Sequence, residues 1–197
     1  MNKSRPALSI KVKLLITLLV FIAPCIGSTQ TRENEVLKLL NAVRTDPKAF
    51  ISSHVNNYLK EKNLTKNNYA KSLVSDLKKC QKMGELKSSK ILNEVAHLHA
   101  LDMGTSGMVG HTSSNGTTFS DRLRKKANAG GMIAENCDYG NEEPLDIVMA
   151  LLIDDGIKSL GHRKNILEPH YQWIGIAIEK HKTYRVNCVM DFAEKIK

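Results

Sequence analysis

Two neighbouring segments near the C-terminus constrain the fold more than any other part of the chain. Residues 173–178 (WIGIAI) are apolar at nearly every position, which predicts a strand covered by other layers on both faces. Residues 184–192 alternate between apolar and polar, which predicts a second strand with one buried face, paired with the first in a hairpin. A sheet buried on both faces needs helices on either side. The expected fold class is therefore α+β, a three-layer α-β-α sandwich with a small, largely antiparallel central sheet.

Helical periodicity identifies the elements that would cover this sheet. A first helix is expected to begin near Thr31, and Ser89 is expected to cap a second helix with one apolar face. Pro144 opens a third helix that extends to Asp155 and is apolar nearly all round, so it should be buried. Residues 133–139 are expected to form a further strand.

The first 27 residues differ from the rest of the chain. They contain four basic residues, no acidic residue and an uncharged apolar run from residue 14, a pattern typical of a secretory signal peptide cleaved after Gly27. An uncleaved membrane anchor is the alternative. The predicted organisation is a signal peptide over residues 1–27 and one secreted, monomeric domain over residues 28–197. Its three remaining cysteines, Cys80, Cys137 and Cys188, allow at most one internal disulfide bond.

A lysine-rich segment stands out at residues 56–90. It contains nine lysines, no arginine and three acidic residues, in a chain whose formal net charge is +9. One interpretation is a patch for an anionic glycan or an anionic lipid membrane surface. The favoured interpretation is a solvated, partly helical insertion, because the lysines show no clear amphipathic pattern and only two aromatic residues, Tyr58 and Tyr69, lie among them. The scarcity of aromatic residues for base stacking and the predicted export also argue against nucleic acid as a partner.

Polar residues at the ends of the predicted elements are the candidates for chemistry. His111 follows a glycine-rich exit from a helix, and His162 follows Gly161. Glu135 lies in an otherwise apolar strand, where a carboxylate is costly unless it has partners. With Asp154, at the end of the buried helix, these residues could form a metal site or a general acid–base set. A polar network that ties the helices to the sheet is the alternative, because spacing alone does not show that the residues meet.

Two motifs resemble the paired signature of the CAP superfamily, which comprises the cysteine-rich secretory, antigen-five and pathogenesis-related proteins and is also called the SCP-like extracellular domain. They are residues 134–137 (AENC) and residues 161–167 (GHRKNIL). Residues 92–96 (LNEVA) and 110–112 (GHT) support the match, and the resemblance extends from about residue 92 to residue 192. The chain lacks the cysteines for the several disulfide bonds of animal and plant members. It is therefore more similar to the disulfide-poor domains of microbes and protists.

The resemblance implies an α-β-α sandwich with a cleft lined by two histidines and two acidic residues. In some members this cleft binds zinc or another divalent cation. Carried over by motif, the implied metal ligands are His111 and His162, with Glu135 and Asp154 lining the cleft, and Asp155 competes with Asp154 for the fourth position. No other cofactor is expected.

The sequence is compatible with three functions. The preferred one is a secreted binding or interaction module with a metal in its cleft, rather than an enzyme. The first alternative is a metal-dependent hydrolase, for which Glu135 and Asp154 are the catalytic candidates and Glu135 would be the general base. The second is a carrier of sterols or fatty acids, which would need an apolar groove. Of the other histidines, His99 is expected to be a hydrogen-bonded core residue and His97 to face solvent.

Overall fold

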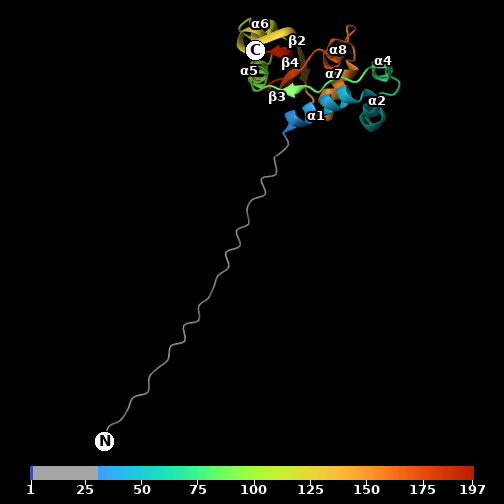
Figure 1. Ribbon diagram of the computed structural model, residues 1–197, viewed down its shortest axis with the longest axis horizontal. Helices are drawn as coiled ribbons and strands as arrows, with labels where there is room; N and C mark the ends of the chain where they lie inside the picture. The colour runs from blue at the N-terminus through green and yellow to red at the C-terminus, as the bar shows by residue number, and fades with distance from the viewer. Residues whose placement is uncertain (2–30) are drawn as a thin grey trace.

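The computed structural model describes residue 1 and residues 31–197, so the predicted signal peptide lies outside the described residues apart from Met1. Figure 1 shows the described domain as layers of helices around a sheet. Within residues 31–197, no helix has both the length and the apolar character needed to cross a membrane. The mixed α and β composition confirms the predicted α-β-α architecture.

The central sheet has four strands in the spatial order β1-β3-β4-β2. The strands are β1 (Lys87–Ser88), β2 (Ala129–Tyr139), β3 (Trp173–His181) and β4 (Arg185–Ile196). The β3–β4 hairpin is antiparallel, and β2 pairs antiparallel with the other side of β4, with Glu135 opposite Asp191. Only the two-residue strand β1 runs parallel to its neighbour, β3. The sheet is thus largely antiparallel, and β2 forms one of its edges.

Helix α5 (Lys90–Ser106) covers one face of the sheet. Ser89 caps this helix as predicted, because its hydroxyl accepts a hydrogen bond from the backbone N–H of Leu92 at 3.5 Å. The helix packs directly on the backbone of β3 at Gly175, where an added Cβ would lie 2.1 Å from the carbonyl carbon of Leu92. Asn93 strengthens this contact by accepting a hydrogen bond from the N–H of Ile176 at 2.9 Å. Glycine is therefore required at position 175, because the backbones of α5 and β3 lie too close together for a side chain.

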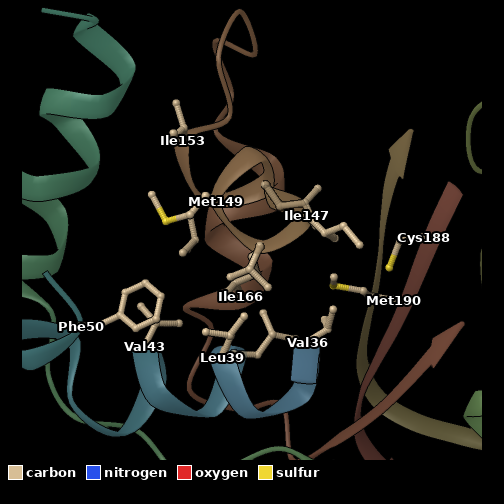
Figure 2. Packing of buried hydrophobic residues seen from close by; sticks show 14 of the residues in the cluster. Val36, Leu39, Val43, Phe50, Ile147, Met149, Ile153, Ile166, Cys188 and Met190 are labelled. Atoms are coloured by element: carbon tan, nitrogen blue, oxygen red, sulfur yellow. The ribbon is translucent and has the colours of Figure 1, made fainter. Parts of the chain in front are cut away.

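The other face of the sheet is covered by a second layer of long and short helices, and the main apolar core lies between that layer and the sheet. The elements of this layer are α1 (Arg32–Thr45), α2 (Pro47–Phe50), η1 (Ile51–Val55), α3 (Asn56–Glu61), α4 (Asn68–Lys79), α7 (Pro144–Ile153) and α8 (Gly161–Ile166). Figure 2 shows part of the core: Val36 and Leu39 of α1, Ile147 and Met149 of α7, and Met190 of β4. All of them are buried, as expected for a helix layer packed on a sheet.

Strand β4 differs from the half-buried strand that its alternating pattern predicts. Every residue from Val186 to Ala193 is buried, including the polar Asn187 and Asp191. The reason is that β4 is an interior strand, with β3 and β2 at its sides and helices on both faces. Its polar residues face α5 rather than water: the Asn187 amide donates a hydrogen bond to the carbonyl oxygen of Ala100 at 3.1 Å. Tyr184, expected at the buried face, precedes the strand and is exposed.

The lysine-rich segment is also more integrated than the solvated insertion that its composition predicts. It forms α3, α4 and β1, and its fully buried Leu73 and Leu77 lie one helical turn apart in the main core. Leu86 joins them from the loop before β1. The amphipathic pattern is present in α4, but the many lysines on its outer face dominate the composition and mask it. The segment is partly helical, as the sequence predicts, but the apolar face of α4 is buried in the core and only its lysine-bearing face is solvated.

Two buried arginines, Arg44 and Arg163, fix α8 within this layer. The Arg44 guanidinium is fully buried and donates hydrogen bonds to four backbone carbonyl oxygens, those of Gly84, Ile166, Glu168 and Tyr171, at 2.8–3.1 Å. Arg163, within α8, donates to the carbonyl oxygens of Leu152 and Ile153 and pairs with Asp76 at 2.8 Å. The start and the end of α8 are thus both anchored by buried cations.

Candidate functional site

The first histidine–carboxylate pair joins the loop after α5 to strand β2. His111 Nδ1 donates a hydrogen bond to Glu135 Oε1 at 2.9 Å; the Glu135 side chain has no exposed surface, whereas 46% of the His111 side chain is exposed. The preceding residue, Gly110, is also held: its N–H donates to the Tyr139 hydroxyl at 2.8 Å and its carbonyl oxygen accepts from His99 Nε2 at 3.0 Å. Because Nδ1 carries the proton, the Nε2 lone pair of His111 is available at the surface.

Arg122 completes this side of the site and was not among the predicted site residues. It starts η2 (Arg122–Lys126), is nearly fully buried, and donates from Nη2 to Glu135 Oε2 at 2.5 Å. Its Nη1 donates to the carbonyl oxygens of His111 and Thr117 and to the Ser113 hydroxyl. Burial alone would raise the pKa of Glu135, but the hydrogen bond from His111 and the charge of Arg122 outweigh it and hold the pKa below its ordinary value. Glu135 is therefore an ionised carboxylate with both oxygens occupied.

The second pair lies between the end of α7 and the start of α8. Asp154 Oδ1 accepts a hydrogen bond from His162 Nδ1 at 2.8 Å, and Asp154 Oδ2 accepts from the backbone N–H of His162 at 3.0 Å. Asp154 adopts a left-handed conformation with φ 57°, which aspartate tolerates better than most residues. Its carboxylate therefore caps α8 and orients the His162 ring, whose side chain is 26% exposed. Asp155 points elsewhere and accepts from Asn67 at 2.9 Å.

Strand β2 connects the two pairs through adjacent residues. Glu135 holds His111, and the next residue, Asn136, faces the opposite side of the strand. Asn136 Nδ2 donates to the backbone carbonyl oxygen of His162 at 3.1 Å, and its Oδ1 accepts from Asn165 at 2.8 Å. The structure thus places each predicted histidine against one of the two predicted carboxylates, and both pairs contact β2, an edge strand of the sheet. Both histidine side chains reach solvent, because that of His111 is 46% exposed and that of His162 is 26% exposed.

A third group with metal-binding atoms lies beneath His111 and comprises the buried residues His99, Glu135 and Cys137, whose ligand atoms lie within 4.8 Å of one another. It fits a divalent cation less well than the two outer histidines. Both His99 ring nitrogens are already hydrogen-bonded, to Gly110 and to Ser113. Burial raises the pKa of the Cys137 thiol, whereas a metal ligand must be a thiolate. His99 is accordingly the hydrogen-bonded core histidine that the sequence predicts.

Asp191 lies behind Glu135 on the neighbouring strand and has no exposed surface. Burial and the negative charge of Glu135 raise its pKa well above its usual range. A neutral Asp191 carboxyl avoids a second buried negative charge beside Glu135. The candidate residues are therefore two nearly inaccessible carboxylates, Glu135 and Asp154, each hydrogen-bonded to a histidine whose ring is partly exposed.

Comparison with known proteins yields one family and several related folds. The CAP family profile, described as the cysteine-rich secretory protein family, matches residues 37–192. An extracellular protein with an SCP domain from Bacillus anthracis superposes with a TM-score of 0.50 at 20% identity, over 64% of this chain and 39% of that protein. A cysteine-rich secretory protein from Staphylococcus aureus superposes with a TM-score of 0.50 at 16% identity, over 86% and 40%. An outer surface protein from Borrelia burgdorferi superposes with a TM-score of 0.49 at 23% identity, over 71% of this chain and 96% of that protein.

The family match and the likenesses to the Bacillus and Staphylococcus proteins establish the fold of the chain. The chain spans about two fifths of the Bacillus and Staphylococcus proteins that it resembles. A search of curated proteins finds no match.

Proposed function

The chain belongs to the CAP, or cysteine-rich secretory protein, family, and from this premise we propose that it is a secreted binding module. Its histidine site would hold a divalent cation, with Zn²⁺ as the best fit. His111 and His162 are the proposed ligands, and Glu135 and Asp154 orient them. Support for secretion comes from the N-terminal sequence and from the extracellular relatives.

One observation carries the metal proposal: both histidines donate Nδ1–H to a buried carboxylate, at 2.9 and 2.8 Å, which leaves Nε2 as the free nitrogen. Metal-binding histidines are commonly fixed in this way, because the carboxylate sets the tautomer and raises the basicity of the ligating nitrogen. Neutral imidazole nitrogens are ligands that Zn²⁺ prefers. With only two protein ligands, a bound ion would keep coordination positions open for an oxygen or nitrogen atom of a partner molecule.

The same contacts argue against the hydrolase alternative. A general base must reach the proton that it removes. Both oxygens of Glu135 are engaged, by His111 and Arg122, and its side chain has no exposed surface. Asp154 is likewise engaged by the ring and the backbone of His162 and is 1% exposed. Neither catalytic candidate is free to accept a proton from water, so positioning the histidines is the role that their contacts support.

The carrier alternative needs an apolar groove. Five pockets of 280–560 Å³ on the described surface are each lined by at least one lysine. Sites for apolar molecules are lined mainly by apolar and aromatic side chains. A binding module therefore remains the function that the structure supports best.

Thermal unfolding of chelator-stripped protein with and without zinc tests the proposal. At about a hundredfold excess over its dissociation constant, zinc should stabilise the folded state by about 2.7 kcal/mol. Since only neutral imidazole binds the ion, the effect should be present at about pH 7.5 and absent at about pH 5. The variant His162→Ala should abolish it.

His97→Ala is the matched control. His97 also pairs through Nδ1 with a carboxylate, Glu179, at 2.9 Å, but its side chain is 50% exposed and lies apart from the site. This variant should respond to zinc as the wild type does. An unchanged melting temperature in the wild type, or an equal loss of the zinc effect in both variants, contradicts the proposed site.

A further inference from the structure

A basic pocket lies between the start of α2 and the end of α4, elements that Figure 1 places at the opposite end of the domain from β2. Its volume is 470 Å³. The lining residues are Asp46, Pro47, Lys48, Lys78, Lys79, Cys80, Gln81 and Lys82. Four lysines from two chain segments, residues 46–48 and 78–82, therefore surround one concavity, with a single acidic residue among them.

The acidic residue of this basic pocket is already used. Asp46 Oδ2 pairs with Lys82 Nζ at 2.6 Å, and Asp46 Oδ1 accepts the backbone N–H of Ala49 at 3.0 Å. The hydrogen bond from Lys82 lowers the pKa of Asp46, so the carboxylate stays ionised and occupied. Nearby Asp76 is likewise engaged, by Arg163 at 2.8 Å.

Three lysines of the basic pocket are left without a counter-charge. Within the described part of the chain, Lys48, Lys78 and Lys79 make no ion pair with an acidic side chain. The carbonyl end of α4 favours cations in its last turn, which accounts for Lys78 and Lys79. It does not account for Lys48, which follows Pro47 in a different helix. Like charges gathered around a concave surface repel one another, and a bound anion relieves that repulsion.

We propose that the basic pocket binds a polyvalent anion that carries sulfate or phosphate groups, with a sulfated oligosaccharide as its ligand class. Lysine ammonium groups on flexible stems bind such groups as point charges from several directions. The alternative, an anionic membrane, is disfavoured because interfacial binding also requires apolar side chains that insert. None of the exposed large apolar side chains of the described residues lines this pocket.

Calorimetric titration with a heparin hexasaccharide at about 0.15 M ionic strength, where the Debye length is about 8 Å, tests the proposal. Chelator is present so that the histidine site plays no part. The triple variant Lys48→Ala/Lys78→Ala/Lys79→Ala should lose affinity by about tenfold. The control variant Lys66→Ala/Lys90→Ala/Lys126→Ala removes the same charge at exposed positions outside the pocket. Its affinity should stay within about twofold of the wild type, because distant exposed charges are screened. An equal loss in both variants overturns the proposal, since the binding would then follow net charge alone.

Two further probes identify the ligand class. Binding to vesicles that contain phosphatidylserine, without binding to the hexasaccharide, would overturn the proposal in favour of a membrane. Inorganic phosphate should bind far more weakly than the hexasaccharide, and equal affinity would contradict a polyvalent ligand. In the wild-type protein, the hexasaccharide should protect Lys48, Lys78 and Lys79 from acetylation while Lys66, Lys90 and Lys126 stay reactive. This readout does not depend on the folding of any variant, and unprotected pocket lysines would refute the site.

Discussion

Replacing Glu135 by glutamine removes the carboxylate that the structure places between Arg122 and His111. Arg122 Nη2 donates to Glu135 Oε2 at 2.5 Å, and the two side chains are 2% and 0% exposed. In the variant Glu135→Gln, the guanidinium would remain buried without a compensating negative charge, and water could not reach it. We therefore expect a large loss of stability from a change of very small volume.

The size of the stability loss depends on the hydrogen bonds that Arg122 and the new glutamine retain. Removing one partner of a buried ion pair costs about 3–5 kcal/mol. Arg122 retains three acceptors at Nη1, and glutamine retains one acceptor oxygen. The expected loss is therefore at the lower end, about 3 kcal/mol in the free energy of unfolding, or about 6–12 °C in melting temperature for a domain of this size.

Urea unfolding at neutral pH, followed by the fluorescence of the single tryptophan, Trp173, measures this loss. Glu142→Gln is the matched control, because Glu142 pairs with Arg185 at 3.3 Å with both side chains more than half exposed. The control should lose less than about 0.5 kcal/mol. If Glu135→Gln also loses less than about 1 kcal/mol, the inference that Arg122 depends on Glu135 is refuted. Zinc affinity should fall about 10–100-fold in Glu135→Gln as the His111 ring loses its orientation.

Two other substitutions test the physical account of the sheet. Burial raises the pKa of Asp138 to about 6, whereas an unfolded aspartate has a pKa of about 4. Between about pH 4 and pH 6 the folded state therefore binds more protons than the unfolded state. The wild-type protein should lose stability as the pH rises through this window. Asp138→Asn should therefore be more stable than the wild type by about 2 kcal/mol at neutral pH and no more stable near pH 4, as measured by urea unfolding at both pH values; a difference independent of pH contradicts the reasoning. Gly175→Ala should cost about 3 kcal/mol, because the new Cβ would lie 2.1 Å from the backbone of Leu92, whereas Gly84→Ala, with nothing within 4 Å, should change the melting temperature little. Similar melting temperatures for both alanine variants would contradict the close approach of α5 to β3.

The main layers could be predicted from the sequence because their apolar periods are long. The apolar run that begins at Trp173 and the helix that begins at Pro144 are each longer than one repeat of a strand or a helix. Their apolar patterns therefore predict which faces are buried. The pairing of Lys87 and Ser88 with β3 could not be predicted, because two residues carry no period. Asn187 and Asp191 were placed on an exposed face since their polarity suggests contact with water. Tertiary packing overrides that preference when helices cover both faces of the sheet.

The candidate site was predictable in its residue types but only partly in its contacts. Glu135 required a partner because an unpaired buried carboxylate is costly, and the structure supplies two. The second of these, Arg122, begins a basic run that resembles an ordinary solvated surface in the sequence, so its burial could not be read from its neighbours. Asn136 was missed for a similar reason: an amide in a strand becomes a site residue only when α8 is placed beside it. Long-range geometry, rather than residue type, decides both roles.

The buried Arg44 constrains the order in which a growing chain can reach this fold. Arg44 is among the first residues of the described domain to be synthesised, yet three of its four carbonyl acceptors belong to residues 166, 168 and 171. A nascent chain that ended before α8 would therefore carry a guanidinium that it could not bury without a large energetic cost. The first helix must wait, solvated or protected by a chaperone, until nearly the whole polypeptide has emerged. Docking of Arg44 on the carbonyl oxygens around the end of α8 therefore belongs to a late stage of folding.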